Sequence, residues 1–266
     1  MDTNEYEWLV MLCATDTMRA ITAMKRQILF TMLVLLPLLA RSAEGDSDVT
    51  DGRLHRFEPL VQNIDGWTVH VDPALVKGEH SREGQRALRM LGDHLNRIAI
   101  LVPEPQLTQL RKMEIWIERE HPTLANMQYH PDVGWLVARG HDPRLAKKVH
   151  ITHARALLDR GQLLKHPAVV LHELAHAYHD QVLDFDHDEI MIAYKSAKRS
   201  GTYEKVLLFT GRHVRHYGMS NQKEYFAEGT EAWFYRNDFY PFVRAELKEH
   251  DPKFHAVLEK IWGVHK

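Results

Sequence analysis

Hydrophobic and polar residues alternate along short segments in the first half of the chain. Alternation with a period of two is typical of strands that bury one face. The clearest example contains Trp67, Val69 and Val71. Similar short segments predict further strands at 113–119, 133–138 and 149–151.

Apolar residues recur at helical spacing in other segments. One stripe follows Ser81, the predicted helix cap, and consists of Ala87, Leu88, Leu91, Leu95 and Ile98. After Pro167 the pattern becomes mostly helical, apart from a predicted hairpin at 206–217. The helices predicted there span 168–183, 188–199, 221–235, 242–249 and 252–262.

These elements predict an α+β fold. A small mixed sheet with one helix is expected in the N-terminal half, and the C-terminal half is expected to be mostly helical. We expect residues 44–266 to form a single domain, with a sheet-containing lobe at 44–160 and a helical lobe at 161–266. Residues 44–56 are polar and are predicted to be disordered.

The segment before this domain has the pattern of a signal peptide. Lys25 and Arg26 precede an apolar run at 28–40, and the small residues Ser42 and Ala43 follow it. A membrane-spanning helix needs about 20 apolar residues, which is more than this run provides. We therefore expect residues 1–43 to be an upstream segment and a signal peptide cleaved near Ser42 or Ala43. The alternative is a buried core helix.

Composition narrows the functional classes. The chain has 266 residues and a formal net charge of −2, which gives no electrostatic reason to expect a nucleic acid or an anionic membrane as partner. The single cysteine, Cys13, lies upstream of the predicted cleavage site. The mature protein would then be secreted or periplasmic, without a membrane anchor, a disulfide or a thiolate nucleophile.

Residues 172–176 form the motif with the clearest chemistry, His-Glu-Leu-Ala-His. On a helix, positions i and i+4 project from the same face, so His172 and His176 can bind one metal ion. Glu173 would then lie beside that ion. Although the chain contains 19 histidines, the apolar residues that flank this motif favour a buried metal-binding helix over a chance match.

A zinc hydrolase also needs a third protein ligand and one open coordination position. The segment Glu224-Tyr-Phe-Ala-Glu228 offers two carboxylates on one helix face. Either can reach the metal while the other supports a ligand histidine. The alternative is a solvated helix face, although Tyr225, Phe226 and Trp233 indicate that this helix is buried.

These residues resemble the gluzincin metallopeptidases whose catalytic domain is similar to that of anthrax lethal factor. The matching pieces are the motif at 172–176 and the block Tyr217-Gly-Met-Ser-Asn-Gln-Lys-Glu224-Tyr-Phe-Ala-Glu228. The resemblance covers roughly residues 160–266 and implies a zincin-like fold.

The resemblance also implies a role for each matching residue. His172, His176 and Glu224 would bind Zn²⁺, and Glu173 would be the general base. Tyr217 would stabilise the tetrahedral intermediate, and Glu228 would support a ligand from the second shell. The expected function is a secreted zinc-dependent endopeptidase that acts on a peptide or protein substrate.

Two other functions remain open at this point. One is a non-catalytic secreted module that binds zinc, and the other is a zinc hydrolase of a non-peptide amide. Asp180, His213 and His216 are further residues that can contribute to the site. The segment 133–138 is the predicted sheet edge at which a substrate strand would pair.

Overall fold

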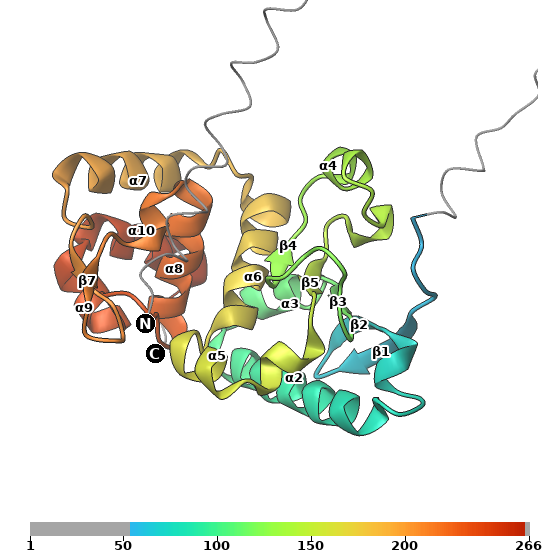
Figure 1. Ribbon diagram of the computed structural model, residues 1–266. Helices are drawn as coiled ribbons and strands as arrows, with labels where there is room; N and C mark the ends of the chain where they lie inside the picture. Colours follow the sequence, from blue (N-terminus) through green and yellow to red (C-terminus); the bar gives the residue numbers. More distant parts are fainter. Residues whose placement is uncertain (1–53, 264–266) are drawn as a thin grey trace, which may run out of the picture. The chain divides into compact units, whose positions relative to one another are not determined.

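The computed structural model describes residues 54–263, and all of them belong to one compact unit (Figure 1). The predicted signal peptide and most of the polar segment 44–56 lie outside the described residues. The main sheet consists of β1 (Leu60–Ile64), β2 (Trp67–Val71), β3 (Ile115–Ile117), β4 (Gln128–Tyr129) and β5 (Val149–Ile151). A separate hairpin pairs β6 (Val206–Leu207) with β7 (His213–Val214).

Helices make up most of the remaining chain. The α-helices are α2 (Ser81–Leu101), α3 (Gln106–Leu110), α4 (Val133–Ala138), α5 (Arg160–Lys165), α6 (Val169–Tyr178), α7 (Asp188–Ser200), α8 (Gln222–Phe234), α9 (Arg244–His250) and α10 (Pro252–Trp262). Short 3₁₀ turns form η1 (Pro73–Leu75), η2 (Pro143–Leu145), η3 (Ala154–Leu158) and η5 (Tyr217–Met219), and α6 continues into a π-helical segment, η4 (His179–Leu183). The small sheet and the helical second half confirm the predicted α+β class.

The strands of the main sheet follow the order β1-β2-β3-β5-β4. The central strands β2, β3 and β5 are parallel, whereas β1 and β4 pair antiparallel at the two ends. Among residues 54–263, strand β4 pairs with β5 alone, so its other side is an edge of the sheet.

The two faces of this sheet carry different side chains. One face is apolar and joins the main core with the buried stripe of α2 and with α6. On the other face Trp116 packs with Phe57, Leu136 and Leu145, and the buried His150 lies on the neighbouring strand. A histidine-rich layer thus covers the side of the sheet that faces away from α6.

Aromatic packing fixes the helices of the second half. The indole of Trp262, which is fully buried, lies 4.5 Å from the Tyr178 ring of α6 and 5.8 Å from the Phe226 ring of α8. In α8, Gly229 lets Phe254 of α10 approach closely, because an added Cβ would lie 2.2 Å from the Phe254 ring. These contacts set how α8 lies beside α6.

Two predictions about local structure are wrong. Residues 133–138 form the helix α4 rather than a strand, because the Asp132 side chain accepts the N–H of Trp135 and caps a helical turn. The open sheet edge is therefore β4. In α2 the cap residue is His80, and Ser81 is already helical, with its hydroxyl bonded to the carbonyl of Gly78.

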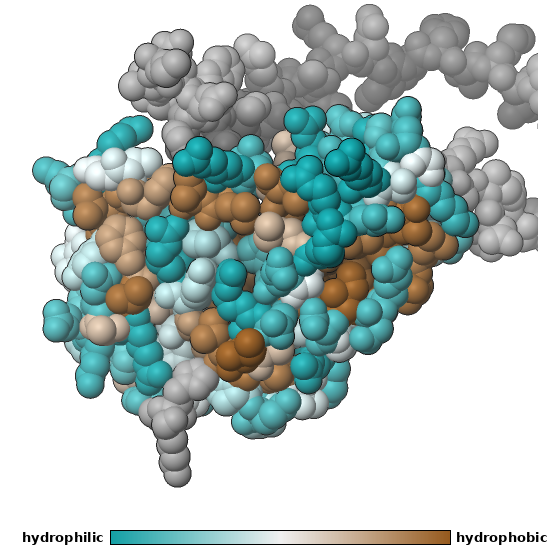
Figure 2. All heavy atoms as spheres, turned by 90° about the horizontal axis from the view of Figure 1, so that it is seen from below, coloured by the Kyte–Doolittle hydropathy of each residue, from teal (hydrophilic) through white to brown (hydrophobic). Residues whose placement is uncertain are grey.

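The surface mixes polar and apolar residues. Figure 2, which views the molecule from below, shows hydrophobic residues in separate patches between hydrophilic ones. None of the helices within residues 54–263 is both long enough and apolar enough to cross a membrane.

Candidate metal centre

Helix α6 carries both histidines of the predicted motif. Apolar neighbours such as Val170 and Leu174 are fully buried, so the helix lies in the interior between the sheet and α8. His172 is 4% exposed, and the side chain of His176 is 12% exposed. Their spacing of four residues places the two imidazoles together, with ring centroids 4.8 Å apart.

Helix α8 brings a carboxylate to these imidazoles. Asn221 caps the helix by accepting the N–H groups of Lys223 and Glu224 at 2.9 and 3.0 Å, which places Glu224 in the first turn. One Glu224 oxygen, Oε2, lies 3.2 Å from Nε2 of His172 and 3.3 Å from Nε2 of His176. The structure therefore brings together the three residues that the sequence predicted as metal ligands.

The three ligand atoms form a nearly equilateral triangle, since the two Nε2 atoms are 3.1 Å apart. A tetrahedral zinc ion with N and O ligands at about 2.0–2.1 Å separates neighbouring ligand atoms by about 3.3 Å. Two imidazoles and a carboxylate are also a usual donor set for a catalytic zinc ion. The described residues thus provide a His/Glu group that fits a metal ion.

Hydrogen bonds within this group of three residues shift the pKa values of His172 and Glu224. Burial alone would lower the pKa of His172, but hydrogen bonds with Glu224 and Glu231 raise it well above its ordinary value. Burial opposes ionisation of Glu224, yet hydrogen bonds from His172 and His176 lower its pKa far below the usual range. The carboxylate is therefore ionised at neutral pH and available to a cation.

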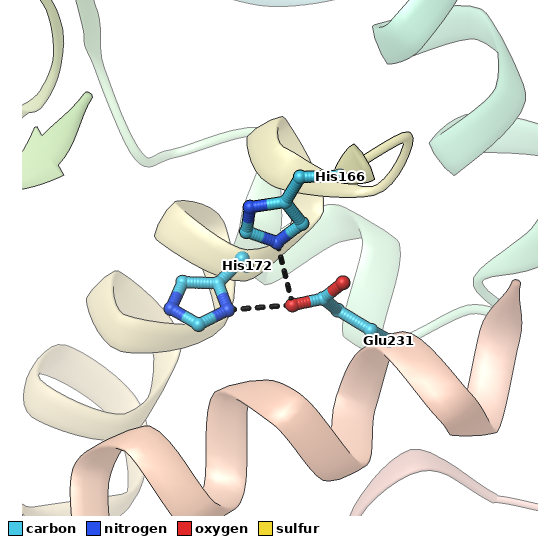
Figure 3. Close-up of side chains that lie close together, drawn as sticks. All are labelled: His166, His172 and Glu231. Atoms are coloured by element: carbon cyan, nitrogen blue, oxygen red, sulfur yellow. Dashed lines mark hydrogen bonds and ion pairs between the residues drawn. The ribbon is translucent and has the colours of Figure 1, made fainter. Parts of the chain in front are cut away.

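The other nitrogen of His172 is bonded to a residue that sequence reasoning missed. Nδ1 of His172 lies 2.6 Å from Oε1 of Glu231, and Nε2 of His166 lies 2.8 Å from the same oxygen (Figure 3). Glu231 is fully buried, and the His166 charge lowers its pKa to about 2 in spite of that burial. This carboxylate fixes the ring orientation of His172, as carboxylates commonly do for metal-binding histidines.

A sequence signal for Glu231 was available. Glu224, Glu228 and Glu231 follow one another at i, i+4 and i+7, which places all three on one face of α8. The spacing alone does not decide whether Glu228 or Glu231 reaches His172. That choice depends on how α8 crosses α6, which only the packed structure defines.

Glu228 lies deeper in the same cluster. Its Oε1 is 3.9 Å from Nδ1 of His172, its Oε2 is 4.0 Å from Nε2 of His216, and it is 2% exposed. Burial and the neighbouring Glu231 charge raise the pKa of Glu228 well above its ordinary value. The predicted supporting role of Glu228 stays a prediction, and Glu231 makes the shorter contact.

Glu173 points toward the sheet edge. Its Oε2 accepts the backbone N–H of Tyr129 in β4 at 2.8 Å, and the residue is 7% exposed. Burial raises the pKa of Glu173, although His172 and His176 oppose this shift. A buried carboxylate with a raised pKa is the electrostatic setting of many general bases.

Tyr217 opens η5, just before α8. It is 48% exposed, yet partial burial and the charge of Glu224 raise its pKa to about 12. The phenol therefore stays protonated at neutral pH and can donate a hydrogen bond. His216 precedes it and caps η5 by accepting the N–H of Gly218 at 3.0 Å.

The remaining predicted residues lie outside this ligand set. His213 is exposed on β7. Asp180 lies in η4, where it accepts hydrogen bonds from Tyr129 and Lys147. Within residues 54–263, neither His213 nor Asp180 therefore belongs to a group of possible metal ligands.

Comparisons with known proteins give few matches. No protein-family model matches the chain, and no curated protein matches its sequence. Among solved structures, the chain is similar to the PRO-PRO endopeptidase PPEP-2 from Paenibacillus alvei, with 20% sequence identity and a TM-score of 0.39. The match covers 70% of this chain and 92% of that chain.

Proposed function

We propose that this protein is a zinc-dependent endopeptidase. The observation that carries the proposal is the triangle of Nε2 of His172, Nε2 of His176 and Oε2 of Glu224, with sides of 3.1 to 3.3 Å. These three residues would hold the ion and leave one tetrahedral position open. When bound, zinc would act as a Lewis acid that lowers the pKa of water to about 7 and polarises a carbonyl.

The side chains around this triangle have the properties that peptide hydrolysis requires. Glu173 accepts a proton from the attacking water and passes it to the leaving amine, and its raised pKa suits both transfers. Tyr217 remains protonated and donates a hydrogen bond to the developing oxyanion. The edge of β4 is the side of the sheet at which an extended peptide would pair, although the Tyr129 N–H on this edge donates to Glu173.

The decisive experiment is the Glu173→Gln substitution. The variant should retain one zinc ion per chain. Its rate of hydrolysis of unfolded casein should fall by about 10²- to 10⁴-fold, because it lacks the general base. Zinc analysis and casein digestion measure the two quantities. Glu79→Gln is the matched control, since the Glu79 side chain is 85% exposed.

Two results would contradict the enzyme proposal. One is a wild-type protein that binds zinc and cleaves neither casein nor a peptide library. The other is a Glu173→Gln variant that cleaves as fast as wild type. The first result would favour a non-catalytic zinc-binding module.

The proposal includes export of the protein. Lys25 and Arg26, the apolar run 28–40 and the small residues that follow it support a cleaved leader. N-terminal sequencing of the exported protein should therefore begin at Ala43 or Glu44. An exported chain that still begins before residue 28 would contradict cleavage.

A further inference from the structure

Strand β4 is the short edge strand that lies beside α6 (Figure 1). It has only two residues, Gln128 and Tyr129, and only two residue pairs join it to β5. So short a ladder gives little stability by itself. The position of β4 therefore depends on contacts outside the sheet.

One such contact joins β4 to Glu173. The backbone N–H of Tyr129 donates to Oε2 of Glu173 at 2.8 Å, and both residues are buried. This bond holds one oxygen of the carboxylate and fixes how the side chain leaves α6. Any shift of β4 would move the hydrogen-bond donor of Glu173.

A second contact joins the Tyr129 side chain to η4, the continuation of α6. The Tyr129 hydroxyl donates to Oδ2 of Asp180 at 2.5 Å, and Lys147 donates to the same oxygen at 2.6 Å. Gln181 donates to the Tyr129 hydroxyl at 3.1 Å and to the Lys147 carbonyl at 3.2 Å. We call Tyr129, Lys147, Asp180 and Gln181 the edge clamp.

The location of the edge clamp links it to the catalytic helix. Asp180 and Gln181 lie in η4, the π-helical continuation of α6, and such segments often occur at functional sites. Lys147 lies in the segment that returns from β4 to β5, where its N–H donates to the carbonyl of His130. The clamp therefore ties the C-terminal end of β4 to the segment that continues the helix that carries Glu173.

We propose that Tyr129 is a positioning residue, which holds Glu173 through its backbone N–H and is itself held in place by the edge clamp. The proposal rests on the proposed function, because orienting Glu173 affects a rate only where Glu173 is a base. Tyr129 acts through Glu173 and binds no metal. Its effect is therefore expected on the chemical step rather than on zinc content.

The test compares Tyr129→Phe and Asp180→Asn with wild type. Each variant should lower kcat roughly tenfold and leave KM and zinc stoichiometry unchanged, because a charge-assisted hydrogen bond that positions the base is lost. The substrate is the peptide that a library digest identifies as the best cleaved. Amide hydrogen exchange at position 129, followed by NMR, should accelerate roughly tenfold in both variants.

Tyr235→Phe is the matched control. It also removes a phenolic hydroxyl, and the Tyr235 hydroxyl makes no hydrogen bond within residues 54–263. This variant should match wild type in kcat and in exchange at position 129. Equal kcat and equal exchange in Tyr129→Phe and wild type would overturn the proposal.

The two readouts separate this inference from the proposed function. If wild type cleaves no peptide, the endopeptidase proposal fails, and the exchange measurement still tests the clamp. Faster exchange at position 129 in Asp180→Asn would then support the clamp as a device that holds β4. Unchanged exchange would overturn it whether or not the protein is an enzyme.

Discussion

Two clusters of buried or partly buried histidines occur in this fold. The helix cluster consists of His166, His172 and His176, beside α8. The sheet cluster lies on the face of the sheet that faces away from α6 and consists of His121, His130, His141 and His150. Histidines are therefore abundant in both clusters, but within the part of the chain that the structure describes only the helix cluster has three ligand atoms close to one another.

In the sheet cluster, several ring nitrogens contact neighbouring protein groups. Nε2 of His130 lies 3.1 Å from Nδ1 of His150, and Nε2 of His150 lies 3.1 Å from Oε1 of Glu118. Nδ1 of His121 accepts the backbone N–H groups of Thr123 and Leu124. Within residues 54–263, these pairwise contacts do not bring three ligand atoms of the sheet cluster together as a group that could hold a metal ion.

The two clusters also differ in which residues pair with their carboxylates. Glu118 pairs with Arg56, so its charge is already neutralised, whereas Glu224 and Glu231 face the histidines of the helix cluster without an arginine partner. Burial lowers the pKa of His130 and of His150 to about 3, while the carboxylates raise that of His172. In this comparison, carboxylates on a neighbouring helix, rather than the number of histidines, distinguish the candidate metal site from a packed polar layer.

The sharpest test of this difference removes one histidine from each cluster. His176→Ala should abolish stoichiometric zinc binding, because it removes one of three ligands. His150→Ala should keep one zinc ion per chain while it destabilises the fold, since it removes the partner of His130 Nε2 and one of the hydrogen bonds of Glu118. Zinc analysis and thermal unfolding measure the two effects. Loss of zinc from His150→Ala instead would assign a metal to the sheet cluster.

A smaller effect is expected from the carboxylates that flank His172. Glu231→Gln should weaken zinc binding about 10- to 100-fold, because the charged partner of Nδ1 is lost. Glu228→Gln is the matched control. The raised pKa of Glu228 favours the neutral acid, so its replacement by a neutral amide hardly changes the charge at this position. Competition with a fluorescent zinc chelator measures both affinities. If Glu228→Gln weakens binding more than Glu231→Gln, the supporting role belongs to Glu228.

Local sequence patterns predicted the parts of the site that depend on a single element. The four-residue spacing of His172 and His176 and the cap at Asn221 are properties of one helix each, so the sequence contains all that determines them. For the same reason the alternation around Trp67 located β2 correctly. The two histidine ligands could therefore be named from spacing alone, whereas the choice of Glu224 over Glu228 came from the resemblance to the gluzincin family.

Features that depend on packing between elements could not be predicted in this way. The contact between Glu231 and His172 depends on how α8 crosses α6, which Trp262 of α10 helps to set. The contact between Tyr129 and Glu173 joins residues 44 positions apart. The apolar residues of segment 133–138 predict a strand, but Asp132 caps a helical turn there.

The smallest predicted effect concerns the acid sensitivity of the sheet cluster. His150 is neutral in the folded state, with a pKa of about 3, whereas an unfolded histidine titrates near 6.5. The groups that face it are Arg56, Glu118, His121, His130, His141, Asp142 and His153.

Between these two pKa values the unfolded chain binds the proton and the folded chain does not. The contribution of neutral His150 to the free energy of unfolding is therefore fully present above about pH 6.5. It declines as the pH falls toward 3. For His150 alone the loss between pH 7.0 and 5.5 is about 1 kcal/mol. Urea unfolding measures the free energy of unfolding at pH 7.0 and at pH 5.5. Its decline between these two pH values should be smaller by this amount in His150→Gln than in wild type. His213→Gln, which changes an exposed histidine, should keep the wild-type decline. An equal decline in His150→Gln and wild type would mean that His150 is protonated in the fold and that the two clusters do not differ in charge.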